Sequence, residues 1–128
     1  MMAEPKVTRP LQYVAFFHFE IRTKEGPAYV FMAVDAFDGH AFNLQVEQDN
    51  RPDTVLKNIY LLLEDPYFVQ NGGDGITLVL EDHEDLAERI RKILKPFHGK
   101  LMFNKAYNNH LANPVMLSML ESMKGSHR

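Results

Sequence analysis

The sequence predicts an α/β domain with a mixed five-stranded sheet and helices on both faces, in the order β-β-β-α-β-α-β-α. Two observations carry this prediction. Residues 13–47 contain three apolar segments joined by short turns, which is typical of an antiparallel meander. Residues 53–123 then alternate helical periodicity with short apolar runs, which is typical of parallel strands joined by helical crossovers.

The strands of the meander are expected at residues 13–23, 28–34 and 41–47. The first strand is rich in aromatic and β-branched residues and is largely apolar on both faces. It should therefore be a central strand that is buried on both sides. A turn at residues 24–27 ends this strand, and Asp35 and Asp38 are expected to act as turn formers at the end of the second.

After the meander, the spacing of apolar residues changes from a strand-like to a helix-like pattern. Pro52 opens a helix that Asp53 is placed to cap. Residues 65–75 include an Asn-Gly-Gly-Asp-Gly run, so a flexible loop is expected there. The continuous apolar run at residues 76–80 is typical of a buried parallel strand.

The last part of the chain should contain a second helix, a brief strand and a third helix. The second helix is expected over residues 86–97 and the strand over residues 101–103. Asn113 followed by Pro114 predicts the start of the third helix, because the pair combines a capping residue with a first-turn proline. Gly125 is expected to end it.

Length and composition bound the class of protein. The chain has 128 residues and 14.8 kDa, which suits one globular domain, expected over residues 9–124 with flexible termini at 1–8 and 125–128. It has no cysteine, which excludes disulfides, thiolate zinc sites and cysteine nucleophiles. No stretch approaches the roughly 18 apolar residues of a membrane span, and the start lacks a signal peptide's apolar centre. A cytoplasmic protein without membrane contact is expected.

Charge is distributed unevenly along the chain. The net charge is -3 and the pI is about 6.0, which argues against a strongly basic nucleic-acid binder. Residues 1–82 hold 13 acids and 6 bases, a balance of -7, whereas residues 83–128 hold 4 acids and 8 bases, a balance of +4. An anionic partner should therefore favour the second part of the chain.

Several motifs resemble one family in both order and spacing. Residues 22–30, followed by Val-Asp-Ala-Phe at 34–37, resemble the second-strand region of bacterial insertion-sequence transposases. Leu-Glu-Asp-His at 80–83 resembles the family's "S-D-x-G" strand end, and residues 107–117 resemble its "y-D-N-a-x-x-E" helix. The similarity spans about residues 9–124. It implies a degenerate member of the DDE integrase and transposase core family, with a ribonuclease H-like fold.

The resemblance also implies a chemistry that this chain lacks the residues to perform. Such cores use three carboxylates to hold two Mg²⁺ ions for phosphodiester cleavage and strand transfer. The three positions fall on Phe17, Asp82 and Leu117. Because Phe and Leu cannot coordinate a hard cation, Asp82 would be vestigial, and no cofactor is expected. Asp82 has an equally simple structural interpretation, as a cap of the helix that starts near Glu84.

An alternative hypothesis is a working Mg²⁺-dependent transposase or nuclease core with displaced carboxylates. Glu20 would replace the missing first Asp, with Glu81 or Glu121 contributing elsewhere. Glu20 lies on the opposite face of a regular strand from Phe17, so a bulge would be needed to turn it inward. Glu121 is one helical turn beyond Leu117.

The remaining signals concern partners. Arg91, Lys92 and Lys95 fall on neighbouring faces of one helix and are the candidate nucleic-acid contacts, although a solvated helix face is the alternative. His18 is expected to be a hydrogen-bonded structural residue, because none of the six histidines has metal-site spacing. The last helix is apolar on nearly every side, which predicts a homo-oligomer contact through Leu117 and its neighbours. No small-molecule substrate is indicated.

Overall fold

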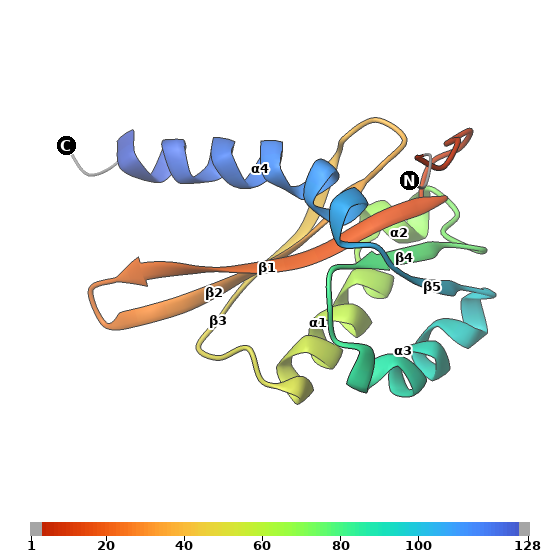
Figure 1. Cartoon of the computed structure of the whole chain (residues 1–128), viewed down its shortest axis with the longest axis horizontal. Helices are drawn as coiled ribbons and strands as arrows, with labels where there is room; N and C mark the ends of the chain where they lie inside the picture. Colours follow the sequence, from red (N-terminus) through yellow and green to blue (C-terminus); the bar gives the residue numbers. More distant parts are fainter. Residues whose placement is uncertain (1–3, 126–128) are drawn as a thin grey trace.

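The computed structural model describes residues 4–125. Five strands form one sheet in the order β3-β2-β1-β4-β5 (Figure 1). The strands are β1 (Tyr13–Thr23), β2 (Gly26–Asp35), β3 (Ala41–Glu47), β4 (Thr77–Leu80) and β5 (Lys100–Phe103). The sheet has the predicted mixture of strand directions. The β1–β2 and β2–β3 pairs are antiparallel, and the β1–β4 and β4–β5 pairs are parallel.

The central position predicted for β1 is confirmed. This strand pairs with β2 along almost its whole length, from Val14 opposite Asp35 to Thr23 opposite Gly26. Its pairing with β4 is short, because the register runs only from Tyr13 to Ala15. Beyond Ala15 the two parallel strands separate, and the β1–β2 hairpin extends away from β4 (Figure 1).

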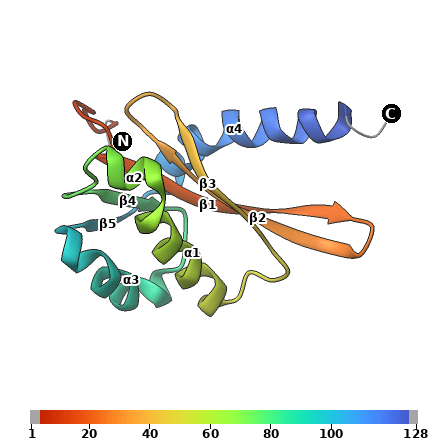
Figure 2. The same cartoon turned by 180° about the vertical axis from the view of Figure 1, so that it is seen from behind.

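Helices cover both faces of the sheet, as predicted. The helices are α1 (Pro52–Glu64), α2 (Pro66–Gln70), α3 (Ala87–Leu94) and α4 (Lys105–Gly125), with single 3₁₀ turns at η1 (Glu84–Leu86) and η2 (Lys95–Phe97). The helices α1, α2 and α3 lie on one face and α4 lies on the other (Figures 1 and 2). The larger apolar core forms under α1 and α3, and a smaller one that includes Phe17 and Ala112 forms under α4.

Two local predictions near α1 and α2 are wrong. Asp53 does not cap α1: the N-cap is Arg51, without a side-chain bond, and Asp53 instead ion-pairs with Arg89 at 3.4 Å. The loop expected at 65–75 contains α2, because Asp65 accepts a hydrogen bond from the Tyr67 amide and Pro66 occupies the first helical turn. Within this segment, Asp65 and the glycine-rich residues 71–75 lie outside a helix.

The start of the last helix was also placed wrongly. α4 begins at Lys105, where the Asn104 side chain accepts a hydrogen bond from the Tyr107 amide at 3.0 Å. Pro114 therefore lies inside the helix and denies it one backbone hydrogen bond. Burial of Ala112 and packing of Val115 against the sheet, on either side of Pro114, offset that cost. Tertiary packing here overrides a strong local signal.

Asp35 forms the predicted turn and also accepts hydrogen bonds from two other segments of the chain. Its carboxylate accepts from the Phe37 amide at 3.0 Å, as a turn former does. The residue is fully buried, and the same carboxylate accepts from the Leu11 amide at 3.1 Å and the Tyr67 hydroxyl at 2.8 Å. Burial, reinforced by the adjacent carboxylate, raises the pKa of Tyr67 well above its ordinary value, so its hydroxyl remains a donor. Asp35 thereby links the N-terminal segment to α2.

Of the termini expected to be flexible, residues 1–3 and 126–128 lie outside the described residues. Thr8 donates its amide to the Gln12 side chain at 2.7 Å, and Gly125 is the last residue of α4. Within residues 4–125, no helix combines the length and the hydrophobicity that crossing a membrane requires.

A buried amide ties α4 to the point where β1 and β4 separate. Asn108 is fully buried, and its Nδ2 atom donates to the Phe16 carbonyl of β1 at 3.0 Å and to the Val79 carbonyl of β4 at 2.9 Å. These carbonyls lie where the β1–β4 ladder ends. One side chain of a helix thus completes hydrogen bonding that the diverging strands no longer give each other.

We expect Asn108→Ala to lower the free energy of unfolding by about 2–3 kcal/mol, because two buried carbonyls lose a donor. Urea denaturation monitored by circular dichroism measures this loss. The matched control is Asn109→Ala, a half-buried neighbour on the same helix, which should change stability by less than about 0.5 kcal/mol. Equal losses in the two variants would contradict the bridging role of Asn108.

Candidate functional site

Phe17, the first position implied by the resemblance, is part of an apolar core. It lies on β1 with 7% of its surface exposed, in the cluster beneath α4 that also contains Val30 and Met32. Its ring stacks on Phe19 with a centroid distance of 6.3 Å. A carboxylate at this position would be surrounded by hydrocarbon, and the phenyl ring fills that space instead.

Asp82, the second position, follows β4 and points outward. Its side chain is 68% exposed and its Oδ1 atom lies 3.1 Å from His83 Nε2. The prediction that Asp82 caps the following helix is wrong. The N-cap of the 3₁₀ turn η1 is His83, and no side-chain hydrogen bond caps that turn. His83 occupies the left-handed backbone region at φ 77°, which reverses the chain direction directly after Asp82.

Leu117, the third position, lies elsewhere. It is 60% exposed on α4 and lines a hollow beside Glu20, Ile21 and Arg22, near the tip of the β1–β2 hairpin. Phe17, Asp82 and Leu117 therefore occupy a packed core, the end of β4 and the hairpin end of α4, respectively. The fold does not bring them together around one point.

Of the carboxylates proposed as replacements, two lie around one hollow and the third lies elsewhere. Glu20 and Glu121 line the same hollow as Leu117, while Glu81 lies at the end of β4 and ion-pairs with Lys105 at 3.7 Å. The β1–β2 register is regular through Glu20, so the bulge that would turn it inward is absent from this described strand pair. Within residues 4–125, no three His, Asp or Glu side chains form a group able to hold a metal ion.

A histidine pair lies at the end of β4. His18 on β1 and His83 after β4 bring their Nε2 atoms to 3.3 Å, and the His18 ring packs on Phe31 at a centroid distance of 4.9 Å. As predicted, His18 is hydrogen-bonded, and its partner is His83. Burial lowers the pKa of His18, and the neighbouring His83 lowers it further, against the opposing effects of Asp82 and Glu81. The two lowering effects favour the neutral form of the imidazole.

Sequence reasoning missed this pair because 65 positions separate its members. The spacing rules for metal or catalytic histidines concern residues on one helix or one hairpin. The only sequence signal was the position of each residue: His18 on a central strand, and His83 directly after the buried run at 76–80.

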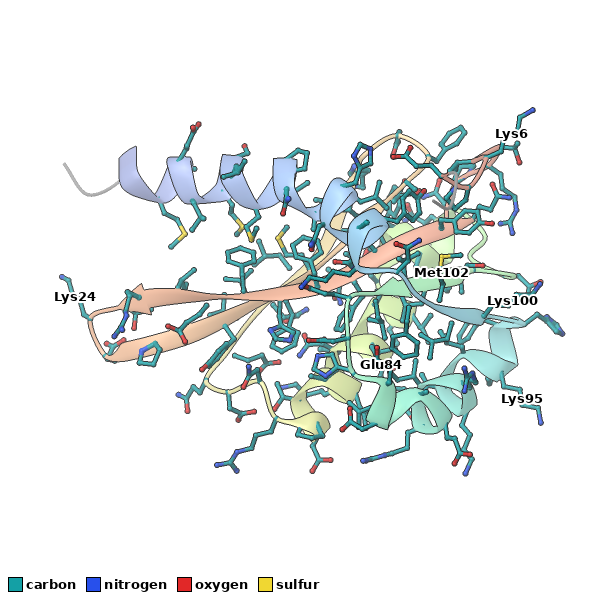
Figure 3. The ribbon with its side chains drawn as sticks, in the orientation of Figure 1. Lys6, Lys24, Glu84, Lys95, Lys100 and Met102 are labelled. Atoms are coloured by element: carbon teal, nitrogen blue, oxygen red, sulfur yellow. The ribbon has the colours of Figure 1, made fainter. Side chains whose placement is uncertain are left out.

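The predicted basic residues gather around one hollow. Arg91, Lys92 and Lys95 line a cavity of about 680 Å³ between α3 and the start of β5, together with His98, Gly99, Lys100 and Leu101. Figure 3 places Lys95 and Lys100 at the end of the molecule opposite Lys24. Among the ion pairs of residues 4–125, none involves Arg91, Lys92, Lys95 or Lys100. Their charge is available to an anion.

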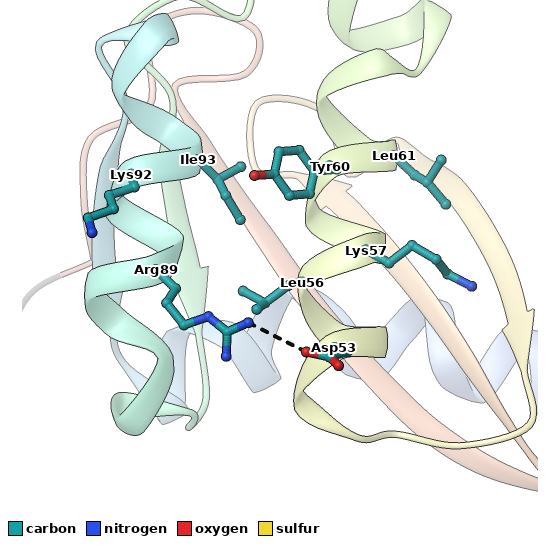
Figure 4. A pocket seen from close by; sticks show the side chains of 8 residues that line it. All are labelled: Asp53, Leu56, Lys57, Tyr60, Leu61, Arg89, Lys92 and Ile93. Atoms are coloured by element: carbon teal, nitrogen blue, oxygen red, sulfur yellow. Dashed lines mark hydrogen bonds and ion pairs between the residues drawn. The ribbon is translucent and has the colours of Figure 1, made fainter.

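A second hollow adjoins this basic one. It lies between α1 and α3, has a volume of about 570 Å³, and is crossed by the Asp53–Arg89 ion pair (Figure 4). Lys92 lines both hollows, while Tyr60 and Lys57 extend the second onto α1. The two hollows therefore adjoin each other along α3, and Lys92 lies between them.

Three exposed apolar side chains lie on β3 and α4. Leu44 and Val46 on the edge strand β3 are 46% and 57% exposed, and Leu117 on α4 is 60% exposed. Leu44 lines a hollow of about 480 Å³ with Val115 and Met119 of α4. The C-terminal half of α4 thus leaves apolar surface uncovered on both of its flanks.

Comparison with known proteins gives similarity in structure alone. No protein-family profile matches the chain, and no curated protein matches it by sequence. The HTLV-2 integrase catalytic core domain in complex with magnesium superimposes in its trimeric form with a TM-score of 0.67 at 9% identity, covering 95% of this chain and 77% of that one. Its dimeric form gives 0.66 at 9% identity, covering 93% and 76%.

A third similar structure is the simian T-cell lymphotropic virus intasome in complex with the PP2A regulatory subunit B56 gamma. It superimposes with a TM-score of 0.67 at 7% identity, covering 95% of this chain and 44% of that one. All three superpositions extend over nearly the whole of this chain, and the shared features are the mixed five-stranded sheet and the helices on both faces. The chain therefore has the ribonuclease H-like fold of the retroviral integrase catalytic cores.

Proposed function

We propose that this chain is an integrase-like domain that performs no metal-dependent strand transfer and acts by binding, with nucleic acid as its partner. The packing of Phe17 is the observation that supports the absence of metal-dependent strand transfer. The position on β1 at which the resemblance calls for a carboxylate is buried in a hydrocarbon cluster. Burying a charge there would cost several kcal/mol, so the cluster is incompatible with a metal-binding carboxylate.

The basic hollow between α3 and β5 supports the binding part. Arg91, Lys92, Lys95 and Lys100 converge on it without carboxylate partners among the described residues. The chain as a whole has a net charge of -3, whereas this cluster of unpaired cations gives its own surface a positive charge. Cations on one helix and the adjoining strand can contact successive phosphates, which gives affinity without base specificity.

Charge reversal at this hollow should weaken nucleic-acid binding. We expect the double variant Lys92→Glu/Lys95→Glu to lose roughly tenfold or more in affinity for a labelled DNA duplex at low salt. The slope of log affinity against log salt should fall by about 2, one for each lost phosphate contact. Fluorescence anisotropy over a salt series measures both quantities.

The matched control is Arg22→Glu/Lys24→Glu, which changes the net charge equally but lies on the β1–β2 hairpin at the other end of the molecule (Figure 3). This control should keep most of the affinity. If both double variants lose affinity equally, the hollow has no special role. If the unaltered chain shows no duplex binding at low salt, nucleic acid is not the partner.

The noncatalytic part has its own test in Mg²⁺ binding. We expect calorimetric titration with millimolar Mg²⁺ to show no saturable site, because no described group of three carboxylates or histidines surrounds a common point. Saturable Mg²⁺ binding that disappears in Asp82→Ala, or in Glu20→Gln and Glu121→Gln, would instead support an active core with displaced carboxylates.

We also propose that the chain associates with itself through the C-terminal half of α4. Leu117 projects from a helix whose flanks are apolar, and Leu44 and Val46 continue this surface onto the edge strand β3. An edge strand and an exposed apolar helix face are surfaces that monomers usually cover. The HTLV-2 core, which has the same fold, is known in dimeric and trimeric forms.

Introducing a charge at Leu117 should weaken this association. We expect Leu117→Lys to shift the chain toward monomer, with at least about a tenfold rise in the dissociation constant, because the lysine ammonium must be desolvated in the contact. Sedimentation velocity over a concentration series measures this. The control is Val69→Lys, a residue of similar exposure (65%) on α2, on the opposite face of the sheet. A monomeric unaltered chain, or equal effects of both variants, would contradict the proposal.

A further inference from the structure

We infer that His18 and His83 form a binding site for a borderline divalent transition-metal ion such as Zn²⁺ or Ni²⁺. The site is distinct from the position of the missing carboxylates. His18 packs on Phe31, which belongs to the core under α1 and α3, whereas Phe17 belongs to the cluster under α4. The two lie on opposite faces of β1, so of the three positions implied by the resemblance only Asp82 adjoins the histidine pair.

The distance between the two imidazoles fits a shared ion. Zinc binds histidine nitrogen at about 2.0–2.1 Å, and two such ligands at a tetrahedral angle lie about 3.3 Å apart. The Nε2 atoms of His18 and His83 are 3.3 Å apart. The two nitrogens are therefore at the spacing that a shared ion requires.

His83 Nε2 has two neighbours that compete for its single proton. His83 Nε2 lies 3.3 Å from His18 Nε2 and also 3.1 Å from Asp82 Oδ1. One proton on His83 Nε2 can serve only one of these two neighbours well, and if it serves Asp82, the two imidazole nitrogens face each other without a donor directed between them. A cation in place of the proton would satisfy both nitrogens together. Neutral imidazole is the form that binds metal.

The backbone and the core hold the pair in place. His83 has a left-handed conformation that is costly for a residue with a side chain, and such conformations persist where the surroundings require them. His18 is held by a central strand, paired with Phe31 across the β1–β2 ladder, and by contact with the Phe31 ring. Little side-chain freedom remains to be lost when an ion binds.

The donors select the class of ion. Imidazole nitrogens suit Zn²⁺, Ni²⁺ and Cu²⁺, whereas Mg²⁺ prefers carboxylate, carbonyl and water oxygens. Because no three His, Asp or Glu side chains among residues 4–125 already surround one point, the two imidazoles carry the site. Asp82, with its side chain 68% exposed, would supply an outer or third oxygen by rotation. Glu81 and Asp82 add the negative charge that favours a cation there.

Isothermal calorimetry of the full chain with Zn²⁺ or Ni²⁺ tests the site. We expect one saturable site, lost in His18→Phe, which keeps an aromatic ring against Phe31, and in His83→Asn, which tolerates the left-handed backbone. Asp82→Asn should weaken binding by roughly 10- to 100-fold, the range seen when a partner of a metal-bound histidine is removed. Mg²⁺ should not compete for the site.

The matched control is His98→Asn. His98 also has a left-handed backbone and also lies beside an aspartate, Asp74 at 2.9 Å, but it has no second imidazole near it among the described residues. Binding should survive this change. Nuclear magnetic resonance of the unaltered chain adds a readout that does not depend on folding of variants: Zn²⁺ should shift the imidazole signals of His18 and His83 together. Absence of those shifts at saturating Zn²⁺, or equal loss of binding in His98→Asn, would overturn the inference.

Discussion

The amide of Asn108 is the constraint on which the arrangement around β4 depends. Two parallel strands that separate leave carbonyl groups without partners, and in a buried location those groups must find another donor. Asn108 supplies it to Phe16 on β1 and to Val79 on β4 from a single side chain. The start of α4 is thereby fixed against the sheet at the point of separation, and β1 is free to continue into the long hairpin.

This separation determines what lies at the end of β4. Because the chain turns sharply at His83, that imidazole points back toward β1, and the continuing strand presents His18 to it. On the other face the same strand presents Phe17 to the hydrocarbon beneath α4. A fold shared with retroviral integrase cores thus carries a packed phenyl ring on one face of β1 and a histidine pair on the other.

Charge and apolar surface are kept at different places on this scaffold. The unpaired cations lie around α3 and β5, whereas the exposed side chains of Leu44, Val46 and Leu117 lie on β3 and on the far half of α4. An anionic partner at the first surface would not cover the second. Nucleic-acid binding and self-association are therefore compatible in one molecule, and the two proposals can be tested with independent variants.

The sequence by itself determined the sheet, since alternation, apolar runs and turn residues are local properties; β1, β3 and the parallel β4 lie where their patterns predict. It also identified Arg91, Lys92 and Lys95 as neighbours, because one helical turn relates them. Local signals failed at Pro114 and Asp53, where packing of α4 and an ion pair with α3 outweighed capping preferences. Only tertiary structure decided that Leu117 lies beside Glu20 and that His18 meets His83. Contacts between distant segments depend on where two strands separate rather than on spacing along the chain.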